Sequence, residues 1–352
     1  MSLILVDGLK DRPGTGGPKF PNGLHLPAGI GITGDGHINM AGVCTFSGNV
    51  TIGGTLTYED VTNIDSVGII TANTGINVVA NGINVQAGIL TAKNIIDASD
   101  AQKNTRVGTN AGNSFDGTTA NRNTLIGYDA GTAITGADDN TIVGTNAGDA
   151  VTTGQENTFV GRHAGGGTNT GRSNVAMGYE TFVTNTTGNY NTALGYEALR
   201  ANTTANENTA VGKAALRANT TGFDNTSVGA QSLEVSTVGH QNSALGYKAL
   251  EANTTGNNNV AVGKQALAAN TTANDNTAIG FRTLYANTTG NQNVGIGNSA
   301  LYANTTGVQN TAIGVFALDA ATTASYNTAV GKGALSSKTT AAQNNAICVN
   351  SL

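Results

Sequence analysis

Apolar residues recur at fixed positions of a 17-residue unit that repeats from residue 104 to the end of the sequence. The unit reads Asn-Thr-Ala-Val-Gly-x-x-Ala-Leu-x-Ala-Asn-Thr-Thr-Gly-x-x, and its positions are called columns 1 to 17. Column 4 is apolar in every unit and mostly β-branched, which is typical of a short strand whose side chains stack into a core. Column 9 adds a second apolar residue, leucine in most units. The pattern predicts short strands in stacked coils, with columns 4 and 9 inside.

Column 5 is glycine in every unit except the last, where Cys348 replaces it. A glycine directly after a short strand indicates a corner that needs positive φ, or a backbone approached too closely for a Cβ. The first four units differ in column 9, where Gly112, Gly131, Gly148 and Gly165 stand in place of leucine. We expect that end of the array to be narrower, or to be filled by other residues such as Ile134 and Val151.

An asparagine opens every unit from Asn104 to Asn344, at a spacing of 17 residues after a first step of 19. A fixed period of this length predicts equivalent coils that contact mainly their neighbours. A helix-pair repeat is disfavoured because each unit holds glycine and an Asn-Thr-Thr run. At about 4.8 Å per coil the units would form a rod of about 70 Å. The asparagines are predicted to form a side-chain ladder or to occupy turn positions: Asn123, Asn140, Asn157, Asn174, Asn191, Asn208, Asn225, Asn242, Asn259, Asn276, Asn293, Asn310 and Asn327.

These patterns divide the chain into three segments. For residues 104–352 they predict an all-β fold, an elongated parallel β-roll or solenoid of 17-residue coils. Residues 1–46 contain all four prolines and many glycines, which favours an extended anchoring segment. Residues 47–103 alternate apolar and polar residues in short bursts broken by glycine. Such strands suit a thin β-prism-like shaft that one chain does not close alone.

Two resemblances to known families add to this prediction. Units such as Asn208-Thr209-Ala210-Val211-Gly212 resemble the head repeats of trimeric autotransporter adhesins. That resemblance implies three parallel β-rolls side by side, with column 4 inside each roll and the small residues of column 3 at the contacts between chains: Ala176, Ala193, Ala210, Ala244, Ala261, Ala278, Ala312 and Ala329.

The run from Gly53 to Gly68, Gly-Gly-Thr-Leu-Thr-Tyr-Glu-Asp-Val-Thr-Asn-Ile-Asp-Ser-Val-Gly, resembles a segment of tail-fibre and virion structural proteins of marine cyanophages. This resemblance implies a homotrimeric virion fibre that is assembled in the host cytoplasm. Its N-terminal part would attach to other virion proteins, and its repeats would project toward the host surface for adhesion. A bacterial surface adhesin and an ice-binding β-solenoid stay open as alternatives, the latter because regular threonine columns can order water.

Composition is compatible with a fibre and makes other classes less favourable. Charged residues are 11% of the chain, aromatic residues 5%, and tryptophan is absent, so a large globular core is not expected. A net charge of −5 without clusters of Lys and Arg argues against binding to nucleic acid. No segment has the pattern of a secretory signal or of a membrane-spanning helix, so we expect synthesis in the cytoplasm and no membrane insertion.

Candidate catalytic groups are few. His25, His37, His163 and His240 are isolated, and Cys44 and Cys348 stand far apart, where we expect free thiols. The densest acidic cluster, Asp138, Asp139, Asp149 and Glu156, would suit a glycosidase only if two of its carboxylates faced one substrate. A solvated surface is the simpler explanation of this cluster. We therefore predict no enzymatic activity, no metal site and no cofactor.

Aromatic residues of columns 6 and 10 are the better functional candidates, because both columns are predicted to face outward. Aromatic faces on a rigid rod could stack on sugars of a host envelope. The simpler alternative is that these rings only cover neighbouring coils. The possible receptor contacts are Tyr128, Tyr179, Tyr196, Tyr247, Phe281, Tyr285 and Tyr302.

Overall fold

The computed structural model describes residues 102–115, 119–337 and 339–351, which belong to one compact unit spanning Val85–Leu352. The predicted anchoring segment, residues 1–46, and all but the last two residues of the predicted shaft, residues 47–103, lie outside the described residues. Both stay predictions, and so does the resemblance carried by Gly53–Gly68.

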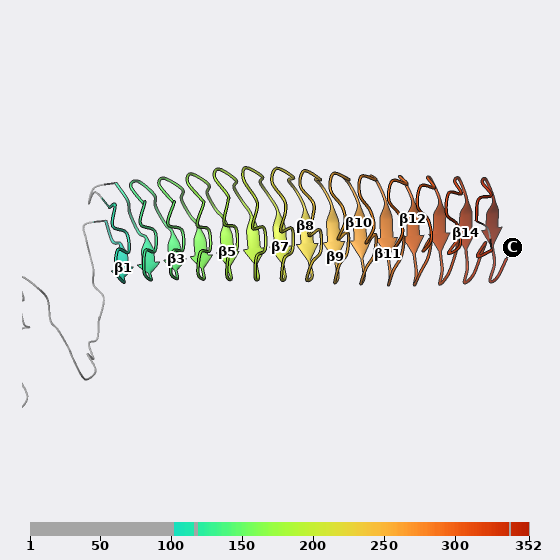
Figure 1. The fold of residues 1–352 in the computed structure, drawn as a ribbon, viewed down its shortest axis with the longest axis horizontal. Helices are drawn as coiled ribbons and strands as arrows, with labels where there is room; N and C mark the ends of the chain where they lie inside the picture. Colours follow the sequence, from blue (N-terminus) through green and yellow to red (C-terminus); the bar gives the residue numbers. More distant parts are fainter. Residues whose placement is uncertain (1–101, 116–118, 338, 352) are drawn as a thin grey trace, which may run out of the picture. The chain divides into compact units, whose positions relative to one another are not determined.

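One three-residue strand per repeat unit forms a single parallel sheet whose strand order follows the chain (Figure 1). Each strand pairs with the next so that equal columns face each other, for example Ala261 with Ala278. No helix is present in the described part of the chain. The prediction of an all-β solenoid with one coil per 17 residues is confirmed. The strands are β1 (Thr105–Val107), β2 (Thr124–Ile126), β3 (Thr141–Val143), β4 (Thr158–Val160), β5 (Val175–Met177), β6 (Thr192–Leu194), β7 (Thr209–Val211), β8 (Thr226–Val228), β9 (Ser243–Leu245), β10 (Val260–Val262), β11 (Thr277–Ile279), β12 (Val294–Ile296), β13 (Thr311–Ile313), β14 (Thr328–Val330) and β15 (Asn345–Ile347).

Backbone hydrogen bonds join neighbouring coils outside the strands as well. In the coil of β7, the N–H groups of Leu216 and Thr220 donate to carbonyls of the following coil at 3.1 and 2.9 Å. The N–H of Gly212 donates to the preceding coil at 2.8 Å. Coils of one strand and tight turns therefore satisfy their polar backbone through their neighbours, which is why the unit needs repetition to be stable.

The glycines of column 5 meet both requirements expected from the sequence. Their φ angles run from +122° at Gly108 to +142° at Gly127, a region that L side chains rarely adopt. An added Cβ would also lie only 2.4–2.7 Å from backbone atoms of the next coil. Each corner that is followed by another coil is thus closed to a residue with a side chain; Cys348, in column 5 of the last coil, has no following coil to meet.

The core is formed by columns 3 and 9, so the predicted place of column 4 inside the roll is wrong. From β2 onward every column-3 residue is buried, including Ala193, Ala210 and Ala278 at 0% exposure. The column-4 residues of the same strands are exposed or half-buried, with Leu194 at 42% and Leu245 at 50%. Neighbouring strand residues point to opposite faces, and the column-9 leucines leave room for only a small residue beside them. The implied role of the column-3 alanines at contacts between chains is wrong for the same reason.

The first coils exchange the sizes of the two core columns. Column 3 carries Leu125, Ile142 and Phe159 there, and column 9 is glycine. A Cβ added to Gly165 would lie 2.4 Å from the Phe159 ring, so the large residue already occupies that space. Ile134 and Val151 are also fully buried in these coils, as the sequence suggested. The interior is therefore filled in the first coils by the large residues of column 3 and in the later coils by the leucines of column 9.

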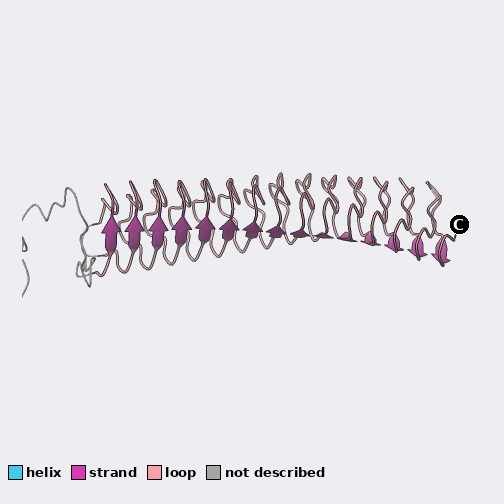
Figure 2. Cartoon of the chain, turned by 90° about the horizontal axis from the view of Figure 1, so that it is seen from below, coloured by secondary structure: helices cyan, strands magenta, loops and turns pink. Residues whose placement is uncertain are grey.

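Strand direction turns progressively along the array. In Figure 2 the strand arrows point one way near β1, are foreshortened in the middle and point the other way near β15. This gradual rotation is the ordinary twist of a parallel sheet. The outward face of the strands therefore winds around the axis of the array.

Candidate functional site

The column-1 asparagines form a continuous buried ladder. Each Oδ1 accepts the backbone N–H of the next asparagine in the column at 2.8–3.1 Å and its Nδ2 at 3.0–3.3 Å, from Asn104 to Asn344. Nδ2 of Asn208 also donates to the carbonyl of Gly222 at 2.9 Å. One asparagine at the same place in every coil keeps each amide within reach of the next, even across the first step of 19 residues, so the ladder holds the coils in register.

A second asparagine ladder occupies column 12, where the Asn-Thr-Thr run by itself indicates only a turn. Nδ2 donates to the preceding Oδ1 in two runs, Asn185–Asn202–Asn219 and Asn253–Asn270–Asn287–Asn304, at 2.8–3.1 Å. Ser236 separates the runs, and Ala321 follows the second. Oδ1 of Asn219, Oγ of Ser236 and Oδ1 of Asn304 are buried with no hydrogen-bond partner. The signal that would have revealed this ladder is the exact return of this asparagine every 17 residues.

Columns 2 and 4 of the fifteen strands form an outward face, which we call the strand face. Column 2 is Thr in ten strands and Val, Ser or Asn in the others, and column 4 is Val, Ile, Leu or Met. None of these thirty residues is charged, although the chain has 39 charged residues. With strands about 4.8 Å apart, the strand face is about 70 Å long and roughly 10 Å wide, on the order of 700 Å².

Charges of opposite sign flank the strand face. Column 17, just before each strand, carries exposed acids from β3 onward, at Asp139, Glu156, Glu207, Asp224 and Asp275. Column 6, just after each strand, has no acid in any described coil and carries exposed bases at Arg162, Lys213, Lys264 and Lys332. Glu156 and Arg162 flank the same strand, β4, and Glu207 and Lys213 both flank β7. The strand face thus has acids along one edge and bases along the other, and the two occur on the same strand at β4 and β7.

The column-6 aromatic residues Tyr128, Tyr179, Tyr196, Tyr247 and Phe281 are 38–54% exposed, and those of column 10, Tyr285 and Tyr302, are half-buried. The structure brings some of them together as stacked pairs along the array. Ring centroids of Tyr179 and Tyr196 lie 5.4 Å apart, and those of Tyr285 and Tyr302 lie 5.3 Å apart. Tyr128 and Tyr247 lie on other coils, so the seven residues do not form one site.

Cations accompany several of these rings. The Arg162 guanidinium lies 5.5 Å from the centroid of the Tyr179 ring, and Lys213 Nζ lies 5.8 Å from that of Tyr196. A hydrogen bond from the Tyr179 hydroxyl lowers the pKa of Glu180, and the charge of Glu197 raises the pKa of Tyr196. Exposed pairs of this kind stabilise the fold little, but they fix the orientation of the rings.

The acidic cluster does not converge on one point. Asp139 makes a paired contact with Arg122, whose Nε and Nη2 donate to its two carboxylate oxygens at 2.6 and 2.8 Å. Glu156 accepts from Ser173 at 2.8 Å, and burial raises the pKa of Asp149. The described residues include no group of three or more His, Cys, Asp or Glu side chains placed to hold a metal ion.

The remaining candidate groups are separate. His240 stacks on Phe223 with centroids 4.7 Å apart, and Cys348 is an exposed free thiol. His25, His37 and Cys44 lie outside the described residues. Within the described ranges, no helix is long and apolar enough to cross a bilayer. No family model, curated protein or solved structure matches this chain.

Proposed function

We propose that this protein is a structural fibre subunit whose repeat arrays associate through the strand face into a parallel homotrimer. The observation that carries this proposal is the uncharged, largely aliphatic strand face. Its area, on the order of 700 Å² with the threonines of column 2 included, approaches the roughly 800 Å² per partner of a stable interface. Further copies of the same chain are the occupant that such a long, periodic face fits.

The edge charges favour parallel copies at equal height. In a cyclic arrangement of parallel rods, the acidic edge of one strand face meets the basic edge of the next, so Glu207 of one copy approaches Lys213 of another. An antiparallel pair in the same contact would place acid against acid. Because the strand face winds, associated arrays would also wind around a common axis (Figure 2).

A rigid trimer of this kind suits a phage virion fibre, in agreement with the resemblance carried by Gly53–Gly68. In this proposal the N-terminal part binds other virion proteins, and the array projects toward the host surface and contacts its glycans. The fibre would assemble in the host cytoplasm and would need no catalytic group or cofactor. A bacterial surface adhesin would use the same array for the same kind of contact.

Light scattering on the purified full chain tests the association. A mass of about three times the 35.3 kDa subunit is expected, and a stable monomer would contradict the proposal. Charge reversal then tests the edges: Glu207→Lys and Lys213→Glu should each weaken association at low salt, by about 10-fold or more, and the double variant should restore it. Equal weakening in the double variant would show that these edges do not meet.

Ice binding is the second candidate, because ten of the fifteen strands present an outward threonine in column 2. The winding of the strand face is unfavourable for it, since an ice plane is flat (Figure 2). A monomer that shows thermal hysteresis, and loses it when column-2 threonines are replaced by lysine, would favour this candidate over the fibre.

A further inference from the structure

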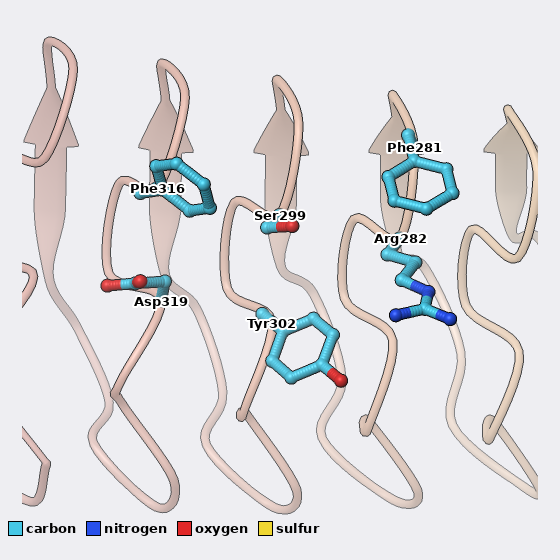
Figure 3. Close-up of a pocket in the computed structure, with 6 residues that line it drawn as sticks. All are labelled: Phe281, Arg282, Ser299, Tyr302, Phe316 and Asp319. Carbon is cyan, nitrogen blue, oxygen red and sulfur yellow. The ribbon is translucent and has the colours of Figure 1, made fainter.

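A pocket opens where a small residue interrupts a column of large ones. Column 7 reads Arg282, Ser299 and Phe316 in three successive coils, and the short serine leaves a gap between its neighbours (Figure 3). Tyr302 and Asp319 of column 10 line the gap together with Phe281 of column 6. Its volume is ≈ 250 Å³.

The aromatic and cationic walls are held in place by their neighbours. Tyr302 stacks on Tyr285 with an interplanar angle of 6°. The Arg282 guanidinium lies 5.2 Å from the centroid of the Phe281 ring and 5.4 Å from that of Tyr285, and its Nε donates to Oε1 of Gln265 at 3.0 Å. These side chains therefore lose little conformational entropy when a ligand binds, which favours binding.

Asp319 supplies a carboxylate to the wall of the pocket. The residue is only partly buried, so a ligand hydroxyl can reach the exposed part of its carboxylate, whereas Oδ1 lies beneath the surface. A hydroxyl that donates to a carboxylate makes a charge-assisted hydrogen bond, which is stronger than a neutral one. With Arg282 on another wall, the pocket holds one acid and one base.

We propose that this pocket binds one neutral pyranose ring of a glycan, which rests on the proposed adhesive function. The apolar C–H face of the sugar packs on the exposed rings of Phe281 and Phe316, which are 41% and 44% exposed. A hydroxyl of the sugar donates to Asp319, and another accepts from Arg282. A neutral ligand with adjacent donors and acceptors fits the balanced charges better than an anion, which Asp319 would repel.

The test uses the full-length protein with methyl α-pyranosides of glucose, galactose and mannose as probes, followed by saturation-transfer NMR and calorimetry. Ser299→Gln is the informative variant, because column 7 already carries glutamine at Gln231 and Gln265 with the same left-handed backbone. It fills the pocket and leaves the other lining residues in place. Tyr326→Ala removes another exposed aromatic residue outside the pocket and is the matched control.

At least one probe is expected to bind the wild type and the Tyr326 variant, with binding lost in Ser299→Gln and at least 10-fold weaker in Asp319→Asn. Absence of binding by all three probes, binding unaffected by Ser299→Gln, or preference for a methyl glucuronide would overturn the proposal. Light scattering on the same samples separates the two proposals. A trimer without sugar binding contradicts only the pocket, and a monomer that binds sugar contradicts only the association.

Discussion

Ser236→Asn is expected to stabilise the array by joining the two runs of the column-12 ladder. In the wild type, Oδ1 of Asn219 and Oγ of Ser236 are buried without partners at this break. An asparagine at position 236 would donate from Nδ2 to Asn219 and would accept from Nδ2 of Asn253. It would also donate to the carbonyl of Gly239, as Asn219 does to Gly222 at 2.8 Å.

The expected gain follows from these three hydrogen bonds. Each is worth about 0.5–1.5 kcal/mol net, and pairing a buried acceptor also removes part of a desolvation penalty of about 1–3 kcal/mol. Ordering one more buried amide side chain offsets part of the gain. We expect the free energy of unfolding to rise by about 2–3 kcal/mol. The amide should fit, because the coils on both sides hold fully buried asparagines in this column.

Urea denaturation followed by circular dichroism measures the effect as a rise of the unfolding midpoint. Ser337→Asn, at an exposed position outside the ladder, controls for the substitution itself and should leave the midpoint unchanged. Ala321→Asn should give a smaller gain, because it supplies the donor that Oδ1 of Asn304 lacks but has no asparagine after it in the column. An unchanged or lower midpoint for Ser236→Asn would refute the view that side-chain pairing in this column stabilises the coils.

Four further predictions concern one corner, the core and two carboxylates. Gly212→Ala should lower the free energy of unfolding, measured by urea denaturation, by at least about 3 kcal/mol. The reason is that φ at this residue is +130° and an added Cβ would lie 2.7 Å from the backbone of the next coil. A near-neutral effect would contradict this close approach. In the core, Ala278→Ile and Leu284→Gly should each lower the free energy of unfolding by about 1–4 kcal/mol. The double variant has the large column-3 and small column-9 residues of the first coils, so it should be at least about 1 kcal/mol more stable than the sum of the two single effects predicts. Strict additivity of the two effects would refute the view that these columns share one space. Burial raises the pKa of Asp319, so its charge destabilises the fold as pH rises above the ordinary value of 3.8, and Asp319→Asn should raise the melting temperature at pH 7 but not at pH 3. Hydrogen bonding to Arg122 lowers the pKa of Asp139, so the ionised carboxylate stabilises the fold above pH 3.8 and this stabilisation is lost as the pH falls below that value. Asp139→Asn should therefore lower the melting temperature at pH 7 but not near pH 2. For Asp319 or Asp139, an equal shift of the melting temperature at both pH values would contradict the role given to that carboxylate.

The coil itself could be predicted from the sequence because its period and its glycines leave few alternatives. A three-residue strand followed by a glycine that needs positive φ, repeated every 17 residues, specifies stacked coils in register. The ladder columns follow from the same period, yet only column 1 is asparagine in every unit. The Asn-Thr-Thr run of column 12 also has the composition of a turn, and composition alone does not separate a buried amide from an exposed one.

Which strand face is inside could not be predicted from one consensus unit. Columns 3 and 4 are both apolar, so alternation along a three-residue strand gives no direction, and size alone favours the larger residue of column 4 for the core. The decisive signal lies in the first coils, where Leu125, Ile142 and Phe159 of column 3 coincide with glycine in column 9. Two columns that exchange bulk share one space, whereas column 4 varies independently of both.

Because column 4 faces outward, its aliphatic residues are not explained by the core of the coil. Columns 3 and 9 already fill the interior, so folding of a single array does not need Ile279 or Leu245 to be aliphatic. Polar residues at these outward positions would cost the isolated coil little and would improve its solubility. A column that stays aliphatic through fifteen strands, between an acidic and a basic edge, is therefore better accounted for by contact between chains than by the stability of one chain. The same reasoning gives a direct criterion: lysine in column 4 of several central strands should leave the coil folded and abolish the trimer.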